Sequence, residues 1–241
     1  MKKIPRSSEL LWLFGIIFVA LGVSICSKAD LGVSMIAAPA FVLSERLAPL
    51  WPFFTVGVTE YVFQGVLLII LCVVVRRFNW RYLLAFAVAV IYGYVLDFFL
   101  FVLQDVVFQA VWLRWVMLIV GDVCTAFGVA CFFRTYMPLQ VYELFVAEFS
   151  TAFQKSINNT KQWFDISLLT VSIVLTVVLF GDIASFDWSD IGYASFHSIG
   201  LGTLVTTAIN SLLIRFMGKW IDRLFDATPR FPTLEKHLKR T

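Results

Sequence analysis

The sequence predicts an all-α integral membrane protein with six transmembrane helices, two short helices and two repeats of inverted topology. Three observations lead to this prediction: an apolar composition, six long apolar runs and a weak internal similarity. Of the 241 residues, 60% are hydrophobic and only 15% are charged. A soluble domain carries about a quarter charged residues, so this many apolar side chains need lipid as their solvent.

Six apolar runs are long enough to cross a bilayer. A spanning helix needs about 20 residues, because each residue adds about 1.5 Å across a hydrocarbon core of about 30 Å. Tryptophans lie at many edges of these runs, as interfacial anchors do. The predicted spans are residues 10–26, 53–75, 82–104, 115–133, 163–180 and 191–214.

Two further apolar segments, 31–46 and 138–154, are shorter. A helix of that length reaches only about 25 Å, so we expect short helices that re-enter the membrane or lie at its edge. Full spans are the alternative. With six spans, most of the 19 Lys and Arg side chains fall on the side of the N-terminus. The positive-inside rule then places both termini in the cytoplasm. We expect the membrane to be a bacterial plasma (inner) membrane. Residues 218–241 form a basic cytoplasmic tail, in which 220–225 are spaced for an interfacial helix.

The first and fourth predicted spans resemble each other when they are offset by 106 residues. The matched pairs are Gly15 with Gly121, Gly22 with Gly128, and Lys28 with Arg134. At an offset of 105, Glu60 falls on Asp165. These matches predict two repeats, 1–108 and 109–217, and since each would hold three spans, the second must enter the membrane from the opposite side. Inverted repeats are typical of secondary transporters.

Three short motifs resemble those of the YitT/YczE-type bacterial membrane proteins. They are residues 28–34 (KADLGVS), 54–57 (FTVG) and 200–204 (GLGTL). Met35 and Ile36 stand where members of that family often have Pro-Trp. The resemblance covers most of the chain and implies a multi-span bacterial membrane protein, but it supplies no substrate, because that family is largely uncharacterised.

Four acidic residues are our candidates for proton or cation coupling: Glu60, Asp97, Asp122 and Glu143. An ionised side chain inside a membrane costs about 2.5 to 3.5 kcal/mol on insertion scales. The first three are expected at a similar depth, where three charged carboxylates would repel one another, so we expect at least one to hold a proton. The alternative is that each lies near the end of its span and reaches water. Glu143 falls in the first turn of the second short helix, where the helix dipole favours a carboxylate.

The basic residues Lys28 and Arg134 predict a substrate site for an anion or a zwitterion. Each precedes a predicted short helix, and a helix N-terminus exposes unpaired N–H groups that favour negative charge. If both loops dip toward the membrane centre, the two cations hold a small carboxylate from two sides, with Gly32, Ser34 and Gln140 lining the site. The alternative is that Lys28 is a surface lysine and Arg134 a cytoplasmic anchor.

The sequence favours a secondary transporter of a small organic solute, coupled to a proton or cation gradient. We expect no enzymatic activity, metal or cofactor, because the chain has only 2 histidines and no Walker, Rossmann or HExxH motif. His197 is more readily explained by packing than by proton transfer. A non-catalytic membrane subunit and, less favoured, a membrane-embedded enzyme are the alternatives. The expected partners are the lipid bilayer and a small-molecule substrate, with no nucleic acid, and a homodimer is compatible with a chain of this size.

Overall fold

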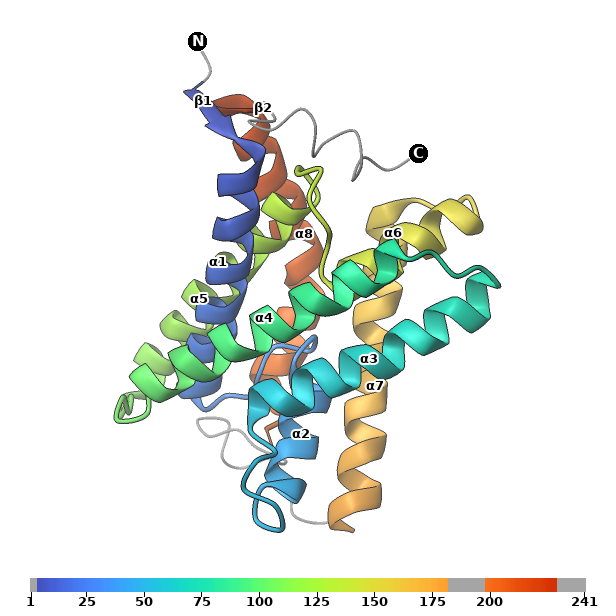
Figure 1. Ribbon diagram of the computed structural model, residues 1–241. Coiled ribbons are helices and arrows are strands. Elements are labelled where there is room, and N and C mark those ends of the chain that lie inside the picture. The colour runs from blue at the N-terminus through green and yellow to red at the C-terminus, as the bar shows by residue number, and fades with distance from the viewer. Residues whose placement is uncertain (1–3, 182–197, 229–241) are drawn as a thin grey trace.

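The computed structural model describes residues 4–181 and 198–228, and nearly all of them are helical (Figure 1). The helices are α1 (Ser8–Ala29), α2 (Ala38–Leu47), α3 (Val56–Val75), α4 (Arg81–Val102), α5 (Val111–Phe132), α6 (Val141–Ala152), α7 (Ile157–Phe180) and α8 (Leu201–Leu224). All except α2 and α6 are long and apolar enough to cross a membrane. The prediction of an all-α membrane protein with six spans is therefore confirmed.

The two remaining helices are short. Helix α2 has 10 residues and α6 has 12, so they reach only about 15 to 18 Å at the rise of an α-helix. Both are largely buried against the longer helices, which agrees with helices that re-enter the membrane and disagrees with the alternative of two further spans.

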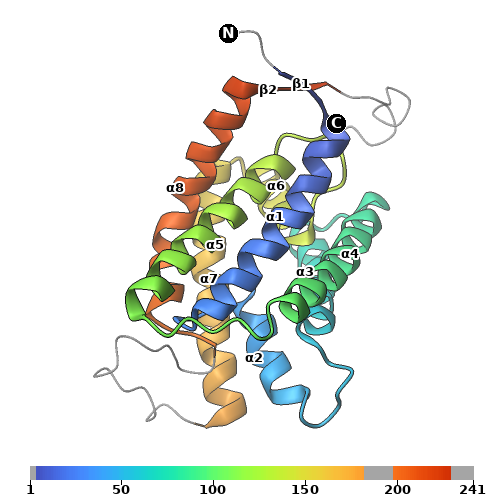
Figure 2. The same ribbon diagram turned by 90° about the vertical axis from the view of Figure 1, so that its left-hand side faces the viewer.

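The order of elements repeats, with a span, a short helix and two more spans in each half. Each long helix of the first half runs opposite to its counterpart in the second: α1 to α5, α3 to α7, and α4 to α8 (Figures 1 and 2). The packing partners are exchanged in the same way, because α2 packs on α7 while α6 packs on α3. The two halves are thus inverted relative to each other and interlocked.

Among the described helices, the most extensive contact joins α1 to α5, and the four glycines that the repeat matches in pairs all lie in it. A Cβ atom on Gly22 would lie 2.5 Å from the carbonyl oxygen of Gly121, and one on Gly121 would lie 2.7 Å from that of Gly22. Gly15 and Gly128 form the second contact of the crossing, where a Cβ on Gly128 would lie 2.8 Å from the Gly15 oxygen. The offset of 106 residues maps Gly22 onto Gly128 and Gly15 onto Gly121, so it converts one contact into the other. The α1–α5 pair is therefore symmetric.

The largest differences from the predicted boundaries lie in the last two spans. Helix α7 begins at Ile157, earlier than the predicted 163, because the Ser156 side chain accepts a hydrogen bond from the Asn159 N–H at 3.3 Å and caps the first turn. Helix α8 continues to Leu224, past the predicted end at 214, so the expected interfacial helix over 220–225 is instead the last turn of this span. The start of the predicted last span, 191–197, lies outside the described residues.

Two short strands, which the sequence analysis did not predict, connect the ends of the helical bundle. β1 (Ile4–Ser7) pairs in parallel with β2 (Phe225–Thr228). The pairing places the start of α1 beside the end of α8 (Figure 2). Residues 4 and 228, which bound the described part of the chain, therefore lie on one side of the bundle, as an even number of spans requires.

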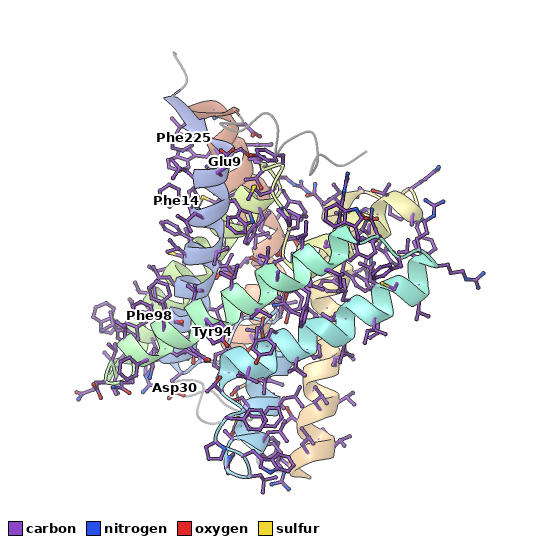
Figure 3. The ribbon with its side chains drawn as sticks, viewed as in Figure 1. Glu9, Phe14, Asp30, Tyr94, Phe98 and Phe225 are labelled. Atoms are coloured by element: carbon purple, nitrogen blue, oxygen red, sulfur yellow. The ribbon has the colours of Figure 1, made fainter. Side chains whose placement is uncertain are left out.

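Many large apolar side chains remain exposed on the long helices, as expected of helices that are surrounded by lipid acyl chains. Tyr94 and Phe98 on α4 are examples, with exposed fractions of 67% and 58% (Figure 3). Contiguous exposed apolar surface on this scale is unusual for a soluble monomer. Polar side chains, in contrast, gather inside the bundle.

Candidate functional site

Nine polar side chains from six helices gather inside the bundle, and we call this set the buried polar network. All are almost completely removed from solvent. The members are Glu60 and Gln64 of α3, Tyr92 of α4, Asp122 of α5, Tyr142 and Glu143 of α6, Lys161 and Asp165 of α7, and Asn210 of α8. Both halves of the chain contribute, so the network lies where the two inverted halves meet.

The network contains one ion pair. The Lys161 ammonium lies 2.6 Å from Oδ1 of Asp165, with the two side chains only 3% and 0% exposed. The Asn210 amide donates a long hydrogen bond of 3.5 Å to the other carboxylate oxygen of Asp165. Lys161 also lies 5.8 Å above the ring of Phe164, within the range of a cation–π contact. The spacing of four residues places Lys161 and Asp165 on one helix face, and that face points inward.

The second part of the network surrounds Glu60. Its Oε1 accepts a hydrogen bond of 3.4 Å from Gln64, one turn further along α3. Tyr142 lies beside Glu60, although its hydroxyl makes no well-formed hydrogen bond. Tyr92 and Glu143 complete the electrostatic surroundings of this carboxyl group. Glu60 is thus enclosed by hydroxyl, amide and carboxyl groups from α3, α4 and α6.

Glu143 and Asp122 connect the network to the ion pair. Glu143 interacts electrostatically with both Lys161 and Asp165, and so does Asp122. Three carboxyl groups therefore interact with a single ammonium group, and a fourth, that of Glu60, interacts with Glu143. A buried carboxylate without a positive partner is very costly, so the network retains protons on its surplus carboxyl groups or binds a positive charge.

Hydrogen-bond acceptors in the network outnumber donors. The buried oxygen atoms of the network that lack a partner are Oε2 of Glu60, Oε1 of Gln64, both carboxylate oxygens of Asp122, the Tyr142 hydroxyl, Oε2 of Glu143 and Oδ1 of Asn210. All except the tyrosine hydroxyl are acceptors when the carboxyl groups are ionised. A proton on Asp122 or Glu143 supplies a donor and also removes a charge, so this arrangement can take up and pass on protons.

The four predicted coupling residues separate into two groups in the structure. Glu60, Asp122 and Glu143 all belong to the network. Asp97 does not, because it serves as a structural cap at the start of α3. Its two carboxylate oxygens accept hydrogen bonds of 2.6 Å from the Thr55 hydroxyl and 2.8 Å from the Gly57 N–H.

The structure does not bring Lys28 and Arg134 together. Lys28 lies near the end of α1 and Arg134 just after the end of α5, and since these helices run in opposite directions, the two cations lie at opposite ends of the pair (Figure 1). Lys28 donates a hydrogen bond of 3.0 Å to the Gln104 carbonyl oxygen, and Arg134 binds both carboxylate oxygens of Asp222 at 2.6 and 2.7 Å. A single anion site between them is therefore excluded by the geometry.

Both ends of the α1–α5 pair are instead closed by local polar contacts. At one end the Tyr136 hydroxyl bonds the carboxylate of Glu9. Toward the other, Arg114 forms an ion pair of 2.7 Å with Asp30. Figure 3 labels Glu9 and Asp30 at these two ends. In each case the loop after the first span of one half is held against the start of the first span of the other half.

The remaining predicted substrate residues, Gly32, Ser34 and Gln140, are explained by their contacts and positions within the protein. Gly32 has a φ of +101°, which favours glycine, and it packs against the backbone of Gly200. The Ser34 hydroxyl contacts its neighbour Met35 at 3.6 Å. Gln140 occupies the N-cap position of α6 without a side-chain capping bond and is buried. None of these contacts identifies a bound solute.

The network also includes residues that the sequence analysis did not select. On the predicted bounds, Lys161 lies before the span that starts at residue 163 and Asp165 lies near its start, so hydropathy gives neither side chain an inward position. The offset that matches Glu60 with Asp165 is a signal for Asp165 alone, and the structure places both residues in the network. His197 lies outside the described residues. Within 4–181 and 198–228, no group of three or more His, Cys, Asp and Glu side chains could hold a metal ion.

Comparisons with known proteins give one match. A family described as a family of unknown function (DUF6198) matches residues 6–219. No curated protein and no solved structure matches the chain. The family match does not test the resemblance to the YitT/YczE-type proteins, which stays a prediction.

Proposed function

The chain belongs to the family of unknown function DUF6198, and from the site that it carries we propose that it is a secondary transporter of a small organic solute, coupled to protons through the buried polar network. The observation that carries the proposal is the position of this network. It lies where two inverted halves interlock, and transporters with inverted repeats bind their substrate and coupling ion at such a junction.

The network offers a physical route to coupling. Asp165 holds Lys161 at 2.6 Å while it is ionised. Protonation of Asp165 removes the charge that binds the ammonium group, and Lys161 then becomes available to a negatively charged group. A carboxylate on an anionic or zwitterionic solute meets this requirement. Uptake of a proton and binding of such a solute then favour each other.

Glu143 gives Lys161 a second partner within the protein. It lies on α6, which packs on α3, whereas Lys161 and Asp165 lie on α7. Glu143, Lys161 and Asp165 all lie in the second half. A transfer of the ammonium group from Asp165 to Glu143 therefore reaches the first half through the contact of α6 with α3. Protonation is thereby linked to the relative position of those halves, as alternating access requires.

The test is solute flux in proteoliposomes with and without a pH gradient. The full chain is reconstituted, a mixture of small carboxylic and amino acids is added outside, and internal solutes are identified by mass spectrometry. We expect at least one solute to accumulate only when a gradient is imposed. Glu60→Gln and Asp122→Asn should each reduce that accumulation to background, because an amide keeps the shape of the side chain but cannot carry the proton.

The matched control is Asp105→Asn, which removes a carboxylate from an exposed loop position and should leave flux unchanged. Unchanged flux in both network variants would remove the coupling role. Absence of gradient-dependent flux for every solute would instead favour the alternatives, a non-catalytic membrane subunit or a membrane enzyme. We further propose that the protein lies in the bacterial plasma membrane. The distribution of Lys and Arg predicts that both termini are in the cytoplasm.

A further inference from the structure

A groove lies on the outside of the bundle between α6 and α7, separate from the buried polar network. Its volume is about 520 Å³, enough for part of a lipid or a drug-sized molecule. Aromatic rings from both helices line most of it, and three polar residues lie at the start of α7. Two features of this lining determine what the groove can bind.

The apolar part of the groove is a set of ordered aromatic rings. The ring of Phe145 lies nearly parallel to that of Phe149, at 10° with centroids 6.2 Å apart, and stacks on Phe164 at 4.9 Å. Trp163 is 70% exposed, which is typical of a tryptophan at the membrane interface. These residues offer a flat hydrocarbon surface that is open to the bilayer.

Three residues that carry hydrogen-bond donors line the polar part of the groove: Lys155, Asn159 and Thr160. Lys155 lies just before α7, where the free N–H groups of the first turn also favour negative charge. All of these groups suit an anion.

Thr160 shows that this end of the groove needs a partner. Its residue is only 9% exposed, and its hydroxyl makes no hydrogen bond. Every other serine or threonine within α7 donates to the carbonyl oxygen four residues before it, at 2.8 to 2.9 Å. Because burying a hydroxyl without a partner is unfavourable, an acceptor bound in the groove that reaches the Thr160 hydroxyl would be favoured.

We propose that this groove binds an anionic phospholipid of the surrounding bilayer. The phosphate lies between Lys155, Asn159 and Thr160, and an acyl chain lies against the aromatic rings. Charge and depth agree, since the donors are at the end of a spanning helix and the rings are nearer its middle. On the predicted topology this end faces the cytoplasmic leaflet, whose anionic lipids attract basic side chains.

The bound lipid has a route to the buried polar network. Phe164 forms part of the groove. Its ring also lies 5.8 Å from the Lys161 ammonium and 6.3 Å from the ring of Tyr142. A lipid that packs on Phe164 therefore stabilises the ring that covers the ion pair. The binding itself does not depend on whether the protein transports a solute.

Native mass spectrometry of the full chain, released from nanodiscs that contain equal amounts of phosphatidylglycerol and phosphatidylcholine, tests the proposal. The wild type should retain phosphatidylglycerol in preference to phosphatidylcholine. The double variant Lys155→Gln/Thr160→Val should lower retention about fivefold or more, the effect of about 1 kcal/mol per basic contact. The matched control, Lys219→Gln, removes an exposed lysine from α8 and should leave retention unchanged.

A second measurement avoids dependence on the double variant. Brominated phosphatidylglycerol should quench tryptophan fluorescence less in Trp163→Phe than in the wild type, because Trp163 lies in the groove. Three results would overturn the proposal: equal retention of both lipids, equal retention by the double variant, or displacement of the lipid by millimolar inorganic phosphate. The last would show a site for free phosphate. A shift from dimer to monomer in the double variant would show that a second copy of the chain covers the groove.

Discussion

Replacing Lys161 with methionine is expected to destabilise the folded protein by about 3–5 kcal/mol, the usual cost of breaking a buried ion pair from one side. The change leaves the Asp165 carboxylate buried, with one long hydrogen bond from Asn210 at 3.5 Å and no cation. It also removes the ammonium group that lies near Glu143 and Asp122. The free energy of unfolding, measured by SDS titration in mixed micelles, is the appropriate readout.

The double variant Lys161→Met/Asp165→Leu distinguishes the loss of the ion pair from the cost of leaving one charge buried without a partner. Replacing both partners with apolar residues of similar size is often neutral, so the double variant should recover most of the lost stability. Lys219→Met is the control, since Lys219 is exposed and its loss should change stability by less than about 0.5 kcal/mol. A double variant as unstable as Lys161→Met would mean that Lys161 stabilises the fold through groups other than Asp165.

The second large effect is expected at the crossing of α1 and α5. Gly22→Val should lower the free energy of unfolding by about 3 kcal/mol or more, because its Cβ would lie 2.5 Å from the backbone oxygen of Gly121. Backbone cannot move aside as a side chain can, so the helices must separate. Gly121→Val should cause a similar loss, since a Cβ atom on Gly121 would lie 2.7 Å from the backbone oxygen of Gly22 on the other side of the same contact.

Gly65→Ala is the control for this pair. The nearest atoms to a Cβ at Gly65 belong to the ring of Phe86, at 3.2 Å, and a side chain of this kind can shift by a few tenths of an ångström. We expect little change in its thermal unfolding. If Gly22→Val unfolds at the same temperature as Gly65→Ala, the α1–α5 contact does not hold the two halves together.

Much of the fold could be predicted because hydropathy reports directly on contact with lipid. Runs of about 20 apolar residues can only be spans or a core too large for this chain, and the short runs became α2 and α6. The boundaries were less certain. The start of α7 was missed because residues 157–162 are polar (INNTKQ), and neither hydropathy nor charge counting can show that Lys161 turns inward.

The composition of the network was only partly predictable. Glu60, Asp122 and Glu143 were selected because carboxyl groups in a membrane need an explanation, and the structure brings them together. Asp97 met the same criterion, yet it caps α3, since sequence spacing does not show that Thr55 and Gly57 of the preceding span lie beside it. Tyr142 and Asn210 carry no sequence signal that separates them from ordinary polar residues of a helix.

The predicted pairing of Lys28 with Arg134 conflicts with the inversion that was predicted alongside it. Two residues matched by an inverted repeat lie at opposite ends of antiparallel helices unless they are near the symmetry axis. The repeat matches Gly22 with Gly128, and these two glycines do not contact each other, because Gly22 contacts Gly121 instead. Lys28 lies in the last turn of α1 and Arg134 just beyond the end of α5, so the inversion separates them. Glu60 and Asp165, matched by the offset of 105, are both buried in the network.

The central claim is that the two halves alternately expose the buried polar network to the two sides of the membrane. A single cysteine at Thr206, a buried position one turn from Asn210 on α8, tests this without knowledge of the solute. In a background with the four native cysteines replaced by alanine, we expect a membrane-impermeant thiol reagent to label Thr206→Cys from either side of sealed vesicles in separate experiments. Labelling from one side only, or from neither, would contradict alternating access and leave a static membrane subunit as the better description.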